Sequence, residues 1–265
     1  MIRHDLPNGR AVFFDPEPHV YYDENGSEFY GVTTVIKDIG GGPPARYYER
    51  NAIEGFYELK RRYPDWAWDD ADASDVLKWL EMEKVDSGAK FRQAGTTGTG
   101  IHKVFEMLPS GDVPADVDPS EADRVSRLLD WWNENVEETL HSEIVTASHN
   151  LGYAGTVEWV GRLKGVDGVG IIDLKSSNYV LQKYHFQLDG YRESVMESGY
   201  GETQWQAVLH LPKDKPGEAP KKARLVPGKA APGAFRAQLE VFKHCKHISP
   251  PRKVNVAVGL RKVAA

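Results

Sequence analysis

The chain has 265 residues, of which 40% are apolar and 27% charged, values that fit one soluble globular domain with a sizeable core. No stretch approaches the ~18 consecutive apolar residues of a membrane span, and Met1–Asp5 does not begin a signal peptide. Cys245 is the single cysteine, which excludes an intramolecular disulfide and a four-thiolate iron–sulfur cluster or zinc site. A reducing cytoplasm is therefore the expected location.

The net charge of −6 argues at first against a nucleic-acid partner, but the charge is unevenly distributed. From residue 200 onward, Lys and Arg outnumber Asp and Glu by 13 to 4, whereas residues 1–199 contain 20 basic and 35 acidic side chains. Because screening limits charge effects to about 10 Å, a basic C-terminal quarter can contact phosphates locally. A solvated basic tail is an equally good explanation.

Short strands are expected in residues 11–37, because β-rich runs flank Asn25-Gly26, a strong hairpin signal. The last of these strands is expected over Val32–Ile36. The following part of the chain is typical of helices, and Asp118-Pro119 is a clear helix start, with Asp118 as a candidate cap. The expected helices cover residues 43–62, 73–93, 98–108 and 118–138.

The character of the sequence changes in its second half. Gly-containing turns separate three β-rich runs, over residues 142–149, 153–163 and 168–175, which predicts an antiparallel meander. The segments after it are a helix over 180–198, a strand over 203–211, a Pro- and Lys-rich loop or ribbon over 212–233 and a helix over 234–247. This order predicts an α/β fold with a mixed sheet flanked by helices.

The third strand of the meander ends in Asp173-Leu174-Lys175. Strand alternation places Asp173 and Lys175 on one face and Leu174 in the core. A buried carboxylate and ammonium are unfavourable unless they are paired or bound to a metal. The hairpin can bring Glu158 beside Asp173, and a divalent cation such as Mg²⁺ or Mn²⁺ relieves the repulsion between two carboxylates. Taken alone, these segments fit a structural ion pair at least as well.

Two further features accompany this hairpin. His102 lies on a predicted helix upstream of the meander, with Glu106 four residues later as a possible orienting group. Gln187 and Tyr191, also four residues apart, share one face of the helix that follows the Asp-x-Lys strand. Each is individually explained by ordinary packing or surface exposure.

The ordered set resembles the RecB-type nucleases of the PD-(D/E)xK superfamily, and more narrowly its stand-alone phage exonucleases. The motifs are His102, Gly155-x-x-Glu158, Asp173-x-Lys175 and Gln187-x-x-x-Tyr191, and Gly31–Ile36 also resembles a segment of the phage enzymes. The resemblance implies a restriction-endonuclease-like core over residues 95–211, within a single nuclease domain over 1–265. An N-terminal hairpin and helical part (1–94) and a basic loop with a C-terminal helix (212–265) complete that domain.

The resemblance also implies roles for individual residues. The metal ligands would be His102, Glu158, Asp173 and the Leu174 carbonyl, with Glu143 as a further acidic position. Lys175 would orient the attacking water or stabilise phosphate charge, and Gln187 and Tyr191 would help to hold the site and the nucleic-acid strand. The family usually has Asp at the position of Glu158, a departure that could alter metal preference or weaken the enzyme.

The implied activity is a Mg²⁺- or Mn²⁺-dependent deoxyribonuclease with one or two ions, acting as an exonuclease on linear DNA in recombination, repair or end processing. Its partners would be DNA and, from the phage resemblance, a recombination or strand-annealing protein in the host cytoplasm. No phosphate-binding loop indicates an ATP site. The alternatives are a structure-specific endonuclease and a catalytically weak nucleic-acid-binding protein on the same fold.

Two groups of side chains are candidates for further DNA contacts. Tyr57, Trp66 and Trp68 could stack on bases, although buried packing is the expected use of at least two of them. A basic stretch could follow the DNA backbone or form a flexible loop. Its residues are Lys213, Lys215, Lys221, Lys222 and Arg224.

Overall fold

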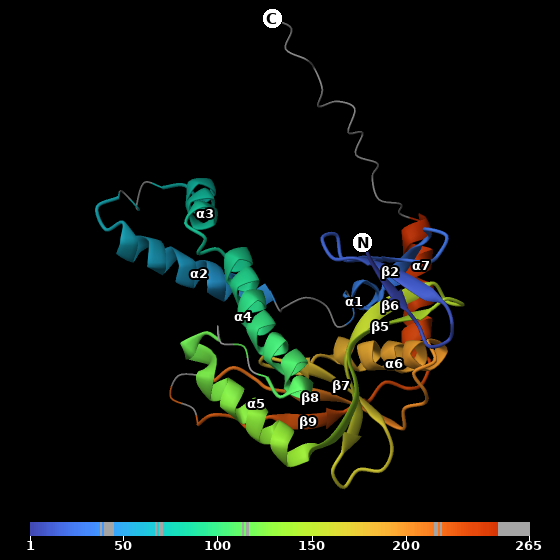
Figure 1. Ribbon diagram of the computed structural model, residues 1–265. Helices are drawn as coiled ribbons and strands as arrows, with labels where there is room; N and C mark the ends of the chain where they lie inside the picture. Colours follow the sequence, from blue (N-terminus) through green and yellow to red (C-terminus); the bar gives the residue numbers. More distant parts are fainter. Residues whose placement is uncertain are drawn as a thin grey trace, which may run out of the picture.

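The computed structural model describes residues 1–37, 39, 45–66, 68, 71–112, 114, 117–214, 217 and 219–248, without the side chains of residues 90–99. These residues form an α/β fold with a mixed, open sheet flanked by helices, as predicted (Figure 1). The strands are β1 (Ile2–Asp5), β2 (Ala11–Asp15), β3 (Val20–Tyr22), β4 (Glu28–Gly31), β5 (Val136–Ser148), β6 (Tyr153–Leu163), β7 (Gly170–Lys175), β8 (Trp205–His210) and β9 (Arg224–Pro227). The helices are α1 (Val32–Val35), α2 (Ala45–Arg62), α3 (Ala73–Met82), α4 (Ser87–Met107), α5 (Ala122–Asn135), α6 (Gln182–Glu197) and α7 (Ala234–Ile248), with 3-10 turns η2 (Leu108–Ser110) and η3 (Pro119–Glu121).

Within the described part of the chain, the strands join in one nine-stranded sheet, in the order β1-β2-β3-β4-β6-β7-β8-β9. β4 and β7 pair with different parts of one edge of β6, and β5 pairs along the other edge. β5, β6 and β7 form the antiparallel meander that the sequence predicts. β8 pairs parallel to β7 after the crossover through α6, and β4 pairs parallel to β6, so the sheet is mixed. β9 adds an antiparallel strand inside the segment predicted as a loop or ribbon.

Helices cover both faces of the central strands (Figure 1). α1, α6 and α7 lie on one face, where Leu188 of α6 and Ile171 of β7 share a buried cluster. α4 and α5 lie on the other face, where Leu128 of α5 shares a cluster with Ile172 and Leu174. Successive residues of β7 therefore alternate between two layers, as expected of a strand that is buried on both sides.

The strand predicted over Val32–Ile36 is wrong, because this segment forms α1. Its buried residues are Val32, Val35 and Ile36, which have helical spacing and pack on the α6 side of the sheet. β-branched residues favoured a strand in the sequence, but burial of this one face decides for a helix.

The helix predicted over residues 73–93 is also wrong. α3 ends at Met82, and α4 begins after Asp86, whose side chain accepts a hydrogen bond from the Ala89 N–H as a helix cap. α4 then continues to Met107 and includes the shorter helix predicted over 98–108.

The helix predicted to reach residue 138 ends at Asn135, and β5 begins at Val136 rather than at 142. The early part of β5 pairs with the end of β6, from Val136 opposite Leu163 to His141 opposite Val160. Pairing with a distant strand thus overrides the local helical tendency of this segment.

α2 and α3 lie apart from the sheet and are connected to it through α4 (Figure 1). The two tryptophans of the connecting loop pack within this pair of helices: Trp66 stacks on Trp79 with ring centroids 4.8 Å apart, and Trp68 is 9% exposed. We predicted that at least two of Tyr57, Trp66 and Trp68 pack inside the protein, and the packing of Trp66 and Trp68 confirms this prediction. Tyr57 is 63% exposed.

Gly155 is required where α6 and α1 approach β6. A Cβ atom at this position would lie 2.8 Å from Tyr191 Cε1 and 3.2 Å from Val32 Cγ2. We expect Gly155→Ala to lower the free energy of unfolding by about 1–3 kcal/mol, the usual effect of overpacking a buried contact. Urea unfolding measures this change.

Gly100→Ala is the matched control, because a Cβ on this exposed glycine of α4 would meet nothing within 4 Å. Its free energy of unfolding should stay unchanged or rise by up to about 1 kcal/mol, since Ala is the better helix former. Equal losses in both variants would contradict the close-approach explanation.

Candidate functional site

The pocket that contains most of the predicted site residues lies where β6 and β7 separate. The two strands pair only between Trp159–Gly161 and Gly170–Ile172, and continuing this register would place Glu158 opposite Asp173. β4 pairs with the same edge of β6 at Tyr153–Ala154. Within the described residues, positions 155–158 of β6 therefore have no strand neighbour on this edge, and the sheet opens there.

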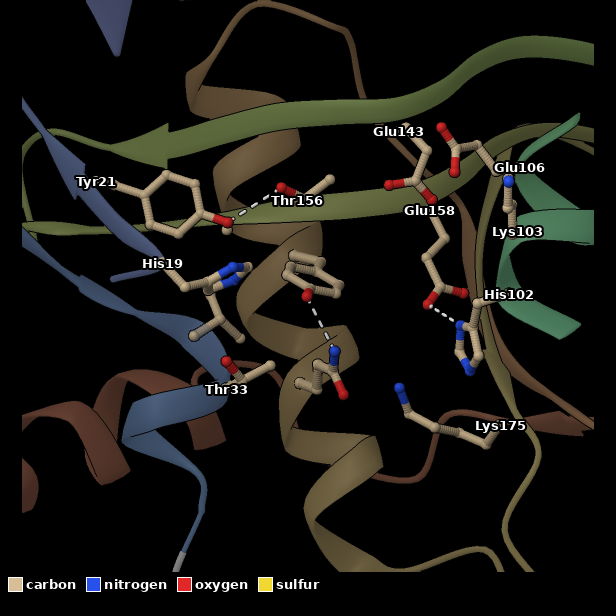
Figure 2. Close-up of a pocket in the computed structure, with 14 residues that line it drawn as sticks. His19, Tyr21, Thr33, His102, Lys103, Glu106, Glu143, Thr156, Glu158 and Lys175 are labelled. Atoms are coloured by element: carbon tan, nitrogen blue, oxygen red, sulfur yellow. Dashed lines mark hydrogen bonds and ion pairs between the residues drawn. The ribbon is translucent and has the colours of Figure 1, made fainter. Parts of the chain in front are cut away.

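This opening is a pocket of about 460 Å³. Six of the eight predicted site residues line it: His102, Glu143, Glu158, Lys175, Gln187 and Tyr191. The other two, Asp173 and Leu174, lie on β7 beside them. Figure 2 shows the lining side chains converging from α4, the β5–β6 pair, β7 and α6. The sequence motifs, which span about 90 residues, therefore meet around one cavity.

Glu158 connects three elements of the pocket. Its Oε1 lies 2.8 Å from Nδ1 of His102 on α4, and its Oε2 accepts a hydrogen bond of 2.6 Å from the Leu174 N–H on β7. Burial would raise the pKa of Glu158, but His102, Lys175 and the Leu174 N–H together hold it below its usual value. Burial would lower the pKa of His102, and Glu158 more than offsets this. The two side chains are consequently paired, and each favours the charged form of the other.

The alternation of β6 breaks at Glu158. Val157 belongs to the buried cluster on the α6 side, whereas Trp159 belongs to the cluster on the α4 and α5 side. Residues two apart on a regular strand share a face, so the strand turns over between them. This irregularity directs Glu158 toward the gap beside β7.

Asp173 is held from two sides. Its Oδ2 lies 2.6 Å from Lys175 Nζ, and its Oδ1 accepts a hydrogen bond of 3.0 Å from Gln187 Nε2. Gln187 also donates to the Tyr191 hydroxyl at 2.9 Å, and the Lys175 ammonium lies 5.1 Å from the centre of the Tyr184 ring. Asp173 and Lys175 thus face α6 together while Leu174 is buried on the other side, which confirms the predicted alternation.

Burial raises the pKa of Asp173, and the neighbouring Lys175 offsets part of this shift. Asp173 is 1% exposed, and its Oδ2 has the Lys175 ammonium at 2.6 Å as a charged partner, without a hydrogen bond of normal geometry to a described group. A buried carboxylate oxygen with an unused acceptor position is a suitable ligand for a cation.

Glu143 adds a further carboxylate at an unusual backbone geometry. It lies opposite Glu158 in the β5–β6 register and has a φ of 50°, which non-glycine residues adopt infrequently. Its side chain stays exposed at the pocket. Partial burial and the nearby carboxylates of Glu158 and Glu106 raise the pKa of Glu143 to about 8. Carboxyl groups are therefore crowded at this end of the pocket.

The chemistry of this donor set fits a hard divalent cation. Carboxylate and carbonyl oxygens suit Mg²⁺ or Mn²⁺, and a cation would relieve the crowding of the carboxyl groups of Glu143, Glu158 and Asp173. The present geometry is not that of a finished metal centre, since no group of three or more His, Cys, Asp or Glu among the described residues is arranged to hold an ion. His102 and Lys175 instead neutralise the carboxylates.

The structure adds residues to the pocket that the motifs do not contain. His19 just before β3, Tyr21 within it and Thr33 of α1 form the wall away from the ion pairs (Figure 2). The hydroxyls of Tyr21 and Thr156 lie 3.0 Å apart and connect this wall to β6. The resemblance of Gly31–Ile36 was the one sequence signal in this region, because contacts between distant strands have no local pattern.

No protein-family model matches the chain, and no curated protein matches it. Among the described residues, no helix is long and apolar enough to cross a membrane.

The raised pKa of Glu143 predicts a pH-dependent stability. Between pH 4.5 and about 8 the unfolded chain ionises Glu143 while the folded chain retains the proton, so this residue makes the fold less stable as the pH rises. We expect Glu143→Gln to be more stable than the wild type at pH 8, by about 1 kcal/mol given solvent screening, and equally stable at pH 4.5.

Urea unfolding in EDTA across this pH range measures the difference. Glu137→Gln removes an exposed carboxylate of the same strand outside the pocket and is the matched control. If the curves of the Glu143 variant and the wild type stayed parallel at every pH, crowding of the carboxylates would be disproved.

Proposed function

We propose that this protein is a divalent-metal-dependent DNA nuclease of the PD-(D/E)xK type, with α4, β5 to β7, α6 and β8 as a restriction-endonuclease-like core. The observation that carries the proposal is the position of Glu158 and Asp173-x-Lys175 at the point where β6 and β7 separate. His102 approaches from the preceding helix and Gln187 from the following one. Side chains from four elements thus surround one solvent-accessible pocket.

The proposed roles are those that the resemblance implies for these residues. His102, Glu158, Asp173 and the Leu174 carbonyl would hold the ion, with Glu143 nearby. When bound, a divalent ion supplies positive charge to the phosphate and lowers the pKa of the attacking water. The Lys175 ammonium contributes a fixed charge where negative charge develops on the phosphate. Gln187 donates hydrogen bonds to Asp173 and to the Tyr191 hydroxyl. These contacts support a role for Gln187 and Tyr191 in positioning the Asp173 carboxylate.

Exonuclease activity on linear DNA is the form of the proposal that the phage resemblance favours. A recombination or strand-annealing protein as a second partner rests on that resemblance alone. An endonuclease would use the same residues, so the substrate topology has to be decided by cleavage assays.

One observation favours a catalytically weak nucleic-acid-binding protein as the second candidate. Both oxygens of Glu158 are already engaged, by His102 and by the Leu174 N–H. An ion would have to compete with the protonated His102 for this carboxylate, which weakens metal binding at low pH. Cleavage rates separate the two candidates.

We expect the purified protein to degrade linear DNA in Mg²⁺ or Mn²⁺ and to leave covalently closed circles intact. Gel electrophoresis of both substrates with each metal and with EDTA tests this. Nicking of circles would indicate an endonuclease. Binding without cleavage of either substrate in either metal would leave the binding protein as the explanation.

Asp173→Ala and Lys175→Ala should each reduce the cleavage rate by at least about 100-fold, the typical effect of removing one group that stabilises transition-state charge. Because each change leaves its buried partner unpaired, loss of stability has to be measured in parallel by thermal unfolding. The double variant Asp173→Asn with Lys175→Met removes both charges, and it should be folded but inactive.

Lys164→Ala is the control for general loss of positive charge, because this exposed lysine lies at the far end of the β6–β7 hairpin. Its cleavage rate should equal that of the wild type. Wild-type activity in a folded Lys175→Ala protein would refute the role given to Lys175.

A further inference from the structure

The wall of the pocket away from the ion pairs contains an exposed aromatic ring that the proposed chemistry does not use. His19 ends the turn between β2 and β3, and its side chain lines the pocket (Figure 2). Its backbone has a φ of 55°, a conformation in which glycine or asparagine is more usual than histidine. The last residue of this turn is therefore a histidine, although its backbone conformation favours glycine or asparagine.

The His19 ring is held in place by two neighbouring rings. Its centroid lies 5.0 Å from that of Phe14 and 5.8 Å from that of Tyr21, with interplanar angles of 87° and 81°. Phe14 and Tyr21 stack on each other at 4.7 Å, and the Tyr21 hydroxyl is fixed by Thr156. Tyr21 is 2% exposed, so His19 is the accessible member of this aromatic group. A ring held by its neighbours loses little conformational entropy when a ligand stacks on it.

The size of the pocket limits what can lie between His19 and the ion pairs. Its volume of about 460 Å³ is in the range of sites that enclose one small organic ligand. One nucleotide is of that size, whereas a base-paired duplex is much larger. Thr33 and Thr156 provide hydroxyls along the wall between the two ends.

We propose that His19 stacks on the base of an unpaired nucleotide whose phosphate lies at the Glu158, Asp173 and Lys175 end of the pocket. This inference rests on the proposed nuclease function and specifies its substrate as DNA with a single-stranded nucleotide at the reactive position. Every base presents an aromatic face, so this contact accepts all four bases. His19 is then a positioning residue and takes no part in the bond cleavage.

Binding assays test this contact without cleavage. Fluorescence anisotropy measures the Kd of a labelled ten-nucleotide single strand in Ca²⁺, with no Mg²⁺ or Mn²⁺ present. His19→Asn removes the aromatic ring and tolerates the positive φ, and it should bind at least about five-fold more weakly, the lower end of the effect of one stacked base. His19→Phe keeps a ring and should bind as tightly as the wild type. His244→Asn, an exposed histidine on α7, should have no effect.

A scan with abasic nucleotides separates stacking from a general structural effect. Each position of the single strand is made abasic in turn, and the Kd values of the wild type and His19→Asn are compared. At one position the loss of the base should abolish the difference between the two proteins, because both changes remove the same contact. An equal penalty for His19→Asn at every abasic position would overturn the proposal, as would wild-type affinity in His19→Asn for the intact strand.

The result is independent of cleavage. Coupling between His19 and one base in a protein that fails to cut DNA would support the stacking site and refute the nuclease. Cleavage by a protein in which His19→Asn leaves the Kd and KM unchanged would support the nuclease and refute the stacking site.

Discussion

The geometry of the pocket depends on one hydrogen bond, which the carboxylate of Glu158 accepts from a backbone N–H of β7 where strand pairing has ended. Where β6 and β7 separate, the Leu174 N–H loses the partner that antiparallel pairing would provide, and Glu158 Oε2 accepts its hydrogen bond instead. A buried N–H without a partner would destabilise the fold by about 1–3 kcal/mol. The same carboxylate reaches His102 through Oε1, so one side chain closes the gap in hydrogen bonding and connects α4 to β7.

This arrangement gives a structural reason for a glutamate at position 158, where the nucleases that the chain resembles usually have aspartate. The side chain has to reach both a backbone N–H on β7 and an imidazole on α4 from a point where the strand turns over between Val157 and Trp159. The additional methylene group extends that reach by about one bond. Glu158 thus acts in the fold as well as in the proposed chemistry, because the separation of the two strands needs its hydrogen bond.

Charge is balanced around the pocket by pairs that come from different parts of the chain. Lys175 offsets Asp173 and His102 offsets Glu158, while Gln187 satisfies the other oxygen of Asp173. The carboxyl group of Glu143 is additional to these pairs, and partial burial and the nearby carboxylates raise its pKa. Removing one partner of the His102–Glu158 or Asp173–Lys175 pair leaves a buried charge without its counter-charge, so these two pairs are sensitive to single substitutions.

The sequence by itself determined the parts of this protein that follow from local periodicity. The three-stranded meander, helix α6, strand β8 and the shared face of Asp173 and Lys175 were predictable because strand alternation and helical spacing are properties of neighbouring residues. The tertiary structure alone decided why β5 starts at Val136 and why Val32–Val35 is helical, since packing against distant parts of the sheet outweighs local preference there. It also decided that β6 and β7 separate at Glu158, where hydrogen bonds from the Leu174 N–H and to His102 meet. His19 and Tyr21 complete the pocket through a contact that only the fold creates, since Tyr21 and Thr156 are 135 positions apart in the chain.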